Sequence, residues 1–144
     1  MRAGWWEPHT ASQAAPLLCI AKRNGKLRTV VDARQWNNNT VKDVTLLPDQ
    51  ELIREDVARA RYRLKIDLVD AYEQVRVQSE DVHKTAFTTI TGIYISNVVQ
   101  QGDCNAPATF QQLMTAIFHN AIGHFLHVYL DDIFIYSNSI EEHE

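Results

Sequence analysis

Two adjacent carboxylates, Asp131 and Asp132, form the most informative pair in this sequence of 144 residues. They stand between two apolar runs, 125–130 and 133–136, that have the composition of strands. Tight hairpin turns favour Asn-Gly or Asp-Gly, and adjacent acids repel each other in a partly apolar setting. A divalent cation such as Mg²⁺, which prefers oxygen ligands, offsets that repulsion. Because an isolated Asp-Asp pair can also be a solvated turn, the pair alone leaves both interpretations open.

A further acidic position, Asp67, ends a second predicted strand. Residues 62–67 alternate between apolar and polar side chains, which is typical of a half-exposed strand. If this strand lies antiparallel beside the runs around Asp131 and Asp132, three carboxylates converge, and three carboxylates can hold two metal ions for phosphoryl transfer. Asp70 has two interpretations, a site residue or an N-cap for the turn that follows.

Positive charge is concentrated on a predicted hairpin. Apolar runs 17–21 and 27–31 flank Asn24 and Gly25, and Asn-Gly is a strong hairpin signal because both residues tolerate positive φ. Phosphate chemistry needs positive side chains, and Arg is suited to bidentate phosphate contacts. A basic hairpin can equally be a solvated surface. Its basic residues are Lys22, Arg23, Lys26 and Arg28.

Charge is divided unevenly along the chain. The formal net charge is −4, but Lys and Arg exceed Asp and Glu by five in residues 1–65, while the acids are in excess by nine in residues 66–144. A negative total argues against a freestanding nucleic-acid binder, which needs an excess of basic residues. The split indicates different electrostatic roles for the two halves.

The composition, 45% hydrophobic and 22% charged, is typical of a soluble globular protein of one domain. Cys19 and Cys104 are far apart and have no zinc-ligand spacing, so neither a disulfide framework nor a zinc site is expected. No apolar run approaches the roughly 18 residues of a membrane span, and the start lacks a signal-peptide pattern. We therefore expect an intracellular protein, cytoplasmic or nuclear, with no membrane partner.

The remaining elements predict an α+β fold, in which an antiparallel sheet packs on helices. Helical spacing after Pro48-Asp49 predicts a helix over 49–59, and Thr91-Gly92 joins two strands, 85–89 and 93–99. Residues 1–15 are expected to be loosely ordered. A helix is predicted from Asn105-Ala106-Pro107 to a stop at Gly123. Its apolar stripe, explained by core packing, is Phe110, Leu113, Met114, Ile117, Phe118, Ala121 and Ile122.

Seven ordered blocks carry a family resemblance. They are Val31-Asp32-Ala33-Arg34 with Asn37, Leu47-Pro48, Lys65-Ile66-Asp67-Leu68, Asp70-Ala71-Tyr72, Lys84-Thr85-Ala86-Phe87, Asn105-Ala106-Pro107-Ala108-Thr109-Phe110 and Tyr129-Leu130-Asp131-Asp132. From about Ala15 to Glu144, their order and spacing resemble the reverse transcriptase of gypsy-type long-terminal-repeat retrotransposons. A lone Tyr-x-Asp-Asp would be weak evidence, whereas seven blocks in order are strong.

The resemblance implies fingers and a partial palm of a right-hand polymerase. Fingers are expected at 1–42 and 75–105, and palm at 43–74 and 106–144, with the thumb and ribonuclease H domain absent. The three carboxylates would be catalytic ligands of two Mg²⁺ ions, or of Mn²⁺, with the backbone carbonyl of Leu68 as a further ligand.

The resemblance also implies nucleotide and template contacts. Arg28, with Lys22 or Arg23, would contact the triphosphate. Tyr72, beside Asp70 and Ala71, would act as the gate against a 2′-hydroxyl. Gln101-Gly102 would line the nucleotide pocket, and Pro107, Phe110 and Tyr129 would face template and primer. Without the resemblance, Tyr72 could be a core aromatic and Gln101 a turn residue. Related elements commonly have Phe-Gly-Leu where this chain has Gln101-Gly102-Asp103, and Asp103 is the more unusual change.

The implied function is two-metal nucleotidyl transfer of deoxynucleoside triphosphates to a primer 3′-hydroxyl on an RNA or DNA template. The missing thumb and ribonuclease H would be other regions of a polyprotein. The alternative is a non-catalytic truncated remnant that acts as a nucleic-acid or protein interaction module. A metal-dependent phosphatase could use the same carboxylates, but it leaves the other blocks unexplained.

Overall fold

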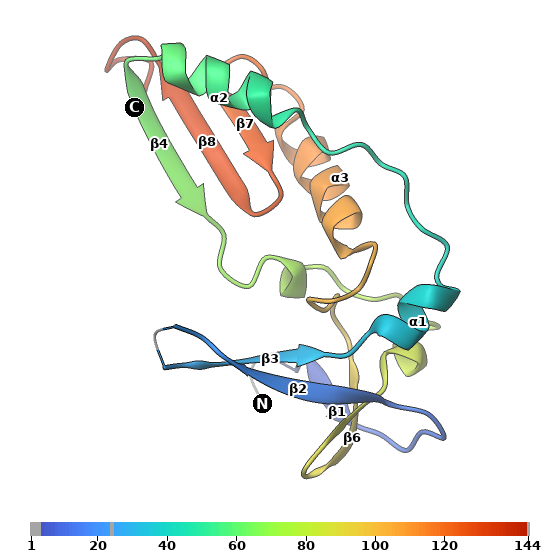
Figure 1. The fold of residues 1–144 in the computed structure, drawn as a ribbon. Helices are drawn as coiled ribbons and strands as arrows, with labels where there is room; N and C mark the ends of the chain where they lie inside the picture. Colours follow the sequence, from blue (N-terminus) through green and yellow to red (C-terminus); the bar gives the residue numbers. More distant parts are fainter. Residues whose placement is uncertain (1–3, 24, 144) are drawn as a thin grey trace. The chain divides into compact units, whose positions relative to one another are not determined.

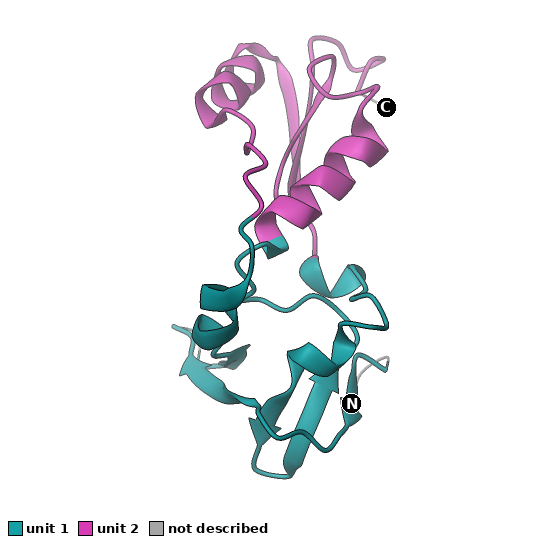
Figure 2. Ribbon diagram, turned by 90° about the vertical axis from the view of Figure 1, so that its right-hand side faces the viewer, with its two compact units in different colours: residues 1–42, 72–106 teal, residues 43–71, 107–144 magenta. Residues whose placement is uncertain are grey.

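The computed structural model of the chain describes residues 4–23 and 25–143 (Figure 1). The chain forms two compact units (Figure 2). Unit 1 combines residues 1–42 and 72–106, and unit 2 combines residues 43–71 and 107–144. Each unit has its own sheet and helices, and the expected α+β class is confirmed.

Unit 1 is built on a five-stranded sheet in the order β1-β6-β5-β2-β3. The strands are β1 (Trp6–Pro8), β2 (Ala15–Ala21), β3 (Leu27–Val31), β5 (Phe87–Thr89) and β6 (Gly92–Ser96). All neighbours are antiparallel except β2 and β5, which run parallel. Both predicted hairpins, β2–β3 and β5–β6, are confirmed. At the tip of the first, Gly25 has the expected positive φ of 77°, and Asn24 lies outside the described residues.

The expectation of loose order over residues 1–15 is wrong for Trp6–Pro8, which form β1. This strand pairs with Tyr94–Ser96 of β6. The indole of Trp6 meets the ring of Phe87 edge-on, with 4.9 Å between centroids, and Phe87 also stacks on Tyr94 at 6.2 Å. Phe87 is fully buried. Aromatic contacts with residues more than 80 positions away therefore order this segment, which a local pattern does not reveal.

Three short helices complete unit 1. They are α1 (Arg34–Asn39) and two single-turn 3₁₀ helices, η1 (Tyr72–Gln74) and η2 (Val82–Thr85). The side chain of Thr85 donates to the carbonyl of Ser96 and accepts from its amide, which ties η2 to β6. No helix in the described part of the chain is long and apolar enough to cross a bilayer.

Unit 2 is built on a three-stranded antiparallel sheet in the order β4-β8-β7. The strands are β4 (Tyr62–Asp67), β7 (Leu126–Tyr129) and β8 (Asp132–Ser137), and the helices are α2 (Gln50–Arg59) and α3 (Ala106–Phe118). The predicted helix over 49–59 is confirmed, and Asp49 caps it by accepting a hydrogen bond from the amide of Glu51 at 2.8 Å. The predicted strand that ends at Asp67 is also confirmed.

Helix α3 ends at Phe118 and not at Gly123 as predicted. Beyond Phe118 the amide of Ala121 turns back to the Phe118 carbonyl, and Ile122 forms a bridge with Leu126. The stripe is only partly a core stripe, because Phe110 and Met114 are buried whereas Leu113 and Ile117 are 40% and 58% exposed. The bridge between Ile122 and Leu126 therefore overrides the helical pattern of residues 119–122.

The aromatic cluster generates a prediction about the stability of unit 1. Phe87→Ala should lower the free energy of unfolding of this unit by about 3–5 kcal/mol, because it leaves a cavity against Trp6 and Tyr94. All three tryptophans of the chain lie in unit 1, so tryptophan fluorescence during urea unfolding reports on it.

The matched control is Ile90→Ala, because Ile90 is fully exposed between β5 and β6. That change should stay within about 0.5 kcal/mol of the unsubstituted chain. Equal losses for the two variants would contradict the packing role assigned to Phe87.

Candidate active site

The pairing of β4 with β8 brings the three predicted carboxylates to one end of the sheet of unit 2. Asp67 lies directly opposite Asp132 in the antiparallel register. Asp131 belongs to the turn before β8, and its carbonyl accepts a hydrogen bond from the amide of Leu68 at 2.9 Å. Residues 65 positions apart in the sequence thus meet through their backbones, as the strand pattern predicted.

Lys65 supplies positive charge at this acidic end. Its ammonium lies 2.8 Å from the Oδ2 atom of Asp132 and 5.7 Å from the ring centroid of Phe134. The hydrogen bond to Asp132, with the charges of Asp132, Asp67 and Asp131, raises the pKa of Lys65 above its ordinary value against partial desolvation. The charges of all three carboxylates therefore act on this one ammonium. Alternation along β4 puts Lys65 and Asp67 on the same face, a signal that the sequence already contained.

The side-chain carboxylates do not form a preassembled ligand set. Among the described residues, no group of three or more His, Cys, Asp and Glu side chains is placed to hold a metal ion. The expected convergence is thus found for the backbone positions and not for the side-chain oxygens. The donor chemistry nevertheless fits Mg²⁺, because carboxylate and carbonyl oxygens are its preferred protein ligands.

A second group of predicted residues lies in unit 1, where β3 contacts the loop before α3. The guanidinium of Arg28 donates to the side-chain carbonyl of Gln101. Gly102 has φ of +118°, and a Cβ there would lie 3.1 Å from the carbonyl oxygen of Val31. A side chain is therefore disfavoured at Gly102, both by backbone conformation and by space. Lys22 and Arg23 are exposed residues of the β2–β3 connection.

Asn37 of α1 holds this loop with both ends of its amide. Its Nδ2 donates to the carbonyl of Gly102 at 2.7 Å, and its Oδ1 accepts from the amide of Cys104 at 2.9 Å. Sequence reasoning placed Asn37 in a family block but assigned it no role. The Asn37 contacts cross more than 60 positions, so no local pattern reveals them.

Asp103, the unusual residue after Gln101-Gly102, is part of the turn itself. Its Oδ2 accepts a hydrogen bond from the amide of Gln100 at 3.0 Å. Burial raises the pKa of the Asp103 carboxyl, and the hydrogen bond from Gln100 opposes that shift. The substitution is therefore accommodated by a local contact, at the cost of a partly desolvated charge.

The other predicted residues lie at element ends. Asp70 has φ of +53° in the turn that precedes η1. Ala71 is buried, Tyr72 begins η1 and is half-buried, and the N-cap interpretation of Asp70 stays a prediction. The remaining three, assigned to template and primer, are Pro107 in the first turn of α3, Phe110 buried in the same helix, and Tyr129 at the end of β7.

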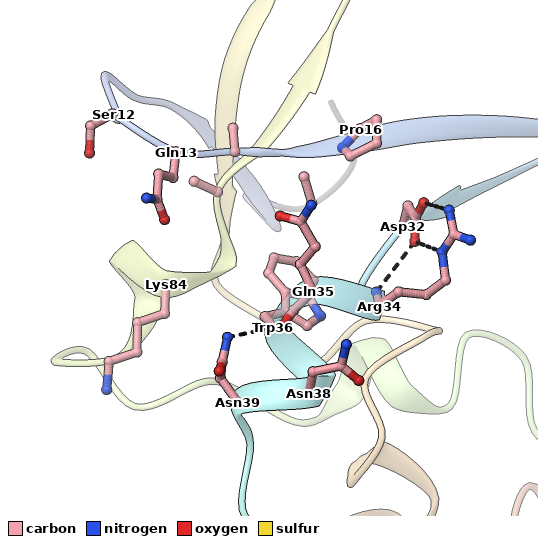
Figure 3. Close-up of a pocket in the computed structure, with 13 residues that line it drawn as sticks. Ser12, Gln13, Pro16, Asp32, Arg34, Gln35, Trp36, Asn38, Asn39 and Lys84 are labelled. Carbon is pink, nitrogen blue, oxygen red and sulfur yellow. Dashed lines mark hydrogen bonds and ion pairs between the residues drawn. The ribbon is translucent and has the colours of Figure 1, made fainter.

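A large open cavity in unit 1 contains none of the predicted site residues (Figure 3). Its volume is about 810 Å³, and it lies between the residues before β2 and helix α1. On its wall Arg34 makes a two-pronged ion pair with Asp32, at 2.8 and 2.6 Å, and the hydrogen bond from Arg34 lowers the pKa of Asp32. The buried Nε1 of Trp36 has no hydrogen-bond partner among the described residues.

The raised pKa of Asp103 generates a pH prediction. Because folding favours the protonated carboxyl, stability contributed by Asp103 should rise as pH falls through its raised pKa towards the ordinary value of 3.8. Asp103→Asn keeps an oxygen acceptor for Gln100 without the charge. This variant should melt at a higher temperature than the parent at pH 7, and the difference should shrink as the pH approaches 4.

The control is Asp81→Asn, which removes a surface carboxylate paired with Lys84. It should leave the melting temperature at pH 7 unchanged or slightly lower. A lower melting temperature for Asp103→Asn than for the parent at pH 7 would show that desolvation of Asp103 is not the dominant effect.

Comparison with known proteins shows the family to which this chain belongs. The family model described as "Reverse transcriptase (RNA-dependent DNA polymerase)" matches residues 20–144. The chain is 30% identical over 99% of its length to the retrovirus-related Pol polyprotein from transposon opus of Drosophila melanogaster, and 37% over 82% to that from transposon 297 of the same species. It is 32% identical over 99% of its length to the Tf2-3 polyprotein of Schizosaccharomyces pombe. The chain spans only 11–15% of these polyproteins.

Solved structures agree with the sequence relatives. A foamy viral protease-reverse transcriptase in complex with double-stranded DNA matches with a TM-score of 0.88 and 25% identity, over 96% of this chain and 24% of that one. A second structure of the foamy viral enzyme with double-stranded DNA matches with a TM-score of 0.84 and 28% identity, over 97% of this chain and 29% of that one. The chain belongs to the reverse transcriptase family, and its fold is that of the fingers and palm.

Proposed function

We propose that this chain is the fingers-and-palm part of an RNA-directed DNA polymerase from a gypsy-type long-terminal-repeat retrotransposon. The observation that carries the proposal is the meeting of Asp67, Asp131 and Asp132 at one end of the β4–β8 pair. The curated relatives support the element type, because they are transposon polyproteins. In this proposal residues 1–42 and 75–105 are fingers, and residues 43–74 and 106–144 are palm.

The acidic end of the sheet is the proposed metal site. Asp67, Asp131 and Asp132, with the carbonyl of Leu68, would hold two Mg²⁺ ions, or Mn²⁺. Bound metal would lower the pKa of the primer 3′-hydroxyl and neutralise charge on the transferred phosphate. Two divalent ions would also cancel the formal charge of −4, so the acidic total is compatible with a nucleic-acid partner.

The basic hairpin and the loop after β6 form the proposed nucleotide site. Arg28, with Lys22 or Arg23, would contact the triphosphate, and Gln101-Gly102 would line the pocket. The Arg28–Gln101 contact and the Asn37 amide support this, because they fix the loop beside a positive side chain. The sugar of the nucleotide would be surrounded by Asp70, Ala71 and Tyr72, and Tyr72 would exclude a 2′-hydroxyl.

Template and primer are the proposed nucleic-acid partners, contacted by Pro107, Phe110 and Tyr129. The foamy viral relatives were solved with double-stranded DNA, which supports a duplex as ligand of the family. Because the formal net charge of the chain is −4, binding of nucleic acid by this chain alone should be weak and dependent on metal.

Primer extension tests the catalytic proposal. Asp131→Asn should lower incorporation of deoxynucleotide by roughly 10²- to 10⁴-fold, because a metal ion contributes several kcal/mol of transition-state stabilisation. Asp81→Asn is the matched control, since Asp81 is a surface carboxylate paired with Lys84. Equal incorporation by the unsubstituted chain and by Asp131→Asn would rule out the proposed metal-dependent mechanism.

Nucleotide binding tests the basic hairpin independently of turnover. Arg28→Ala should weaken Mg²⁺-dependent binding of a deoxynucleoside triphosphate by about 10- to 100-fold, as expected for lost hydrogen bonds to a charged group. Arg61→Ala is the control, because Arg61 is exposed and lies over the ring of Tyr62. No binding by the unsubstituted chain at millimolar nucleotide would favour the alternative, a non-catalytic interaction module.

A further inference from the structure

The turn that carries Asp131 has an unfavourable residue at its first position. Tyr129 pairs with Asp132, so the β7–β8 hairpin has a loop of two residues, Leu130 and Asp131. Leu130 has φ of +55°, and among described residues other than glycine only Asp70 shares a positive φ. A two-residue hairpin with positive φ at its first loop position favours Gly there, because a Cβ is crowded in the left-handed region. Other contacts must therefore stabilise this turn.

Gln111 of α3 provides such contacts. Its Oε1 accepts a hydrogen bond from the amide of Leu130 at 2.8 Å, and its Nε2 donates to the carbonyl of Val128 at 3.3 Å. A second donation from Nε2 reaches the hydroxyl of Thr115 at 3.3 Å. Gln111 is only 2% exposed and is one of the largest fully buried side chains of the described residues. Both polar atoms of its amide are thus bonded, to the backbone at the end of β7 and to its own helix.

The turn is held from both sides. Strand β7 lies at the edge of its sheet, and Gln111 of α3 binds the backbone of Val128 in this strand and of Leu130 just after it. On the opposite side, the amide of Leu68 donates to the carbonyl of Asp131 at 2.9 Å. Gln111 thus fixes the residue before Asp131, and Leu68 fixes Asp131 itself. Together these bonds determine where the backbone of the two acidic residues lies.

We propose that Gln111 is a positioning residue that holds Leu130 in its left-handed conformation and so aims Asp131 and Asp132. Its effect on catalysis rests on the proposed function, whereas its effect on the turn does not. A neutral amide suits this task, since it offers one acceptor and one donor to a backbone edge without adding charge beside the carboxylates.

Amide hydrogen exchange followed by NMR tests the effect on the turn without any activity. Gln111→Met keeps the length and burial of the side chain but removes its hydrogen bonds. The Leu130 amide should then exchange about tenfold faster or more, as expected for the loss of one buried hydrogen bond. The matched control is Gln112→Met, because Gln112 is exposed and contacts Asp43 and Thr45 instead. It should leave the Leu130 amide unchanged.

A second substitution separates positioning from simple core packing. Leu130→Gly removes the Cβ that makes the positive φ unfavourable, so the turn should need Gln111 less. If Gln111 positions the turn, Gln111→Met should cost at least threefold less in the maximal rate of primer extension with Gly at position 130 than with Leu. The KM for deoxynucleotide should change little, since Gln111 is not among the proposed nucleotide contacts.

Three results would overturn the inference: unchanged exchange of the Leu130 amide in Gln111→Met, the same acceleration in Gln112→Met, or an equal rate loss with Leu and Gly at position 130. Faster exchange at Leu130 in a chain that extends no primer would support the effect on the turn and count against the proposed function. The two proposals can therefore fail separately.

Discussion

The antiparallel pairing of β4 with β8 is the constraint on which the acidic end of unit 2 depends, because it sets Asp67 opposite Asp132. Directly opposite like charges destabilise a pair of strands, and Asp67 faces Asp132 at the end of theirs. The opposite face of the same sheet offsets this cost, since Leu126, Val128 and Ile133 are buried there. The remaining features of this end, the Lys65 ammonium and the bonds to the turn, all lower the cost of keeping the acids together.

Elements with strong local signals could be predicted from the sequence. The β2–β3 hairpin follows from Asn-Gly between apolar runs, and α2 follows from its Asp49 cap and helical spacing. The pairing of β4 with β8 was a hypothesis drawn from the acids at the strand junctions, and the register confirms it. For the hairpin and the helix, the decisive interactions lie within a few residues or follow from the period of the chain.

Most other interactions between distant residues could not be predicted. Trp6 is ordered by Phe87, and α3 stops at Phe118 because the following residues turn back and pair near β7. Asn37, which holds the loop at Gly102, and Gln111, which holds the turn at Leu130, were missed for the same reason, since polar side chains in a helix carry no signal of a backbone partner elsewhere. The resemblance located Gln101-Gly102 but not the contacts that hold it, which the fold alone supplies.

The position of β4 at the edge of its sheet has a consequence for the behaviour of the chain in solution. Edge strands expose unpaired backbone groups, and charged side chains along them hinder association with other strands. Leu64 and Ile66 are 47% and 39% exposed on this strand, and its charged residues oppose association through these apolar side chains. Replacing Lys65 or Asp67 would therefore also promote self-association of the chain through this edge.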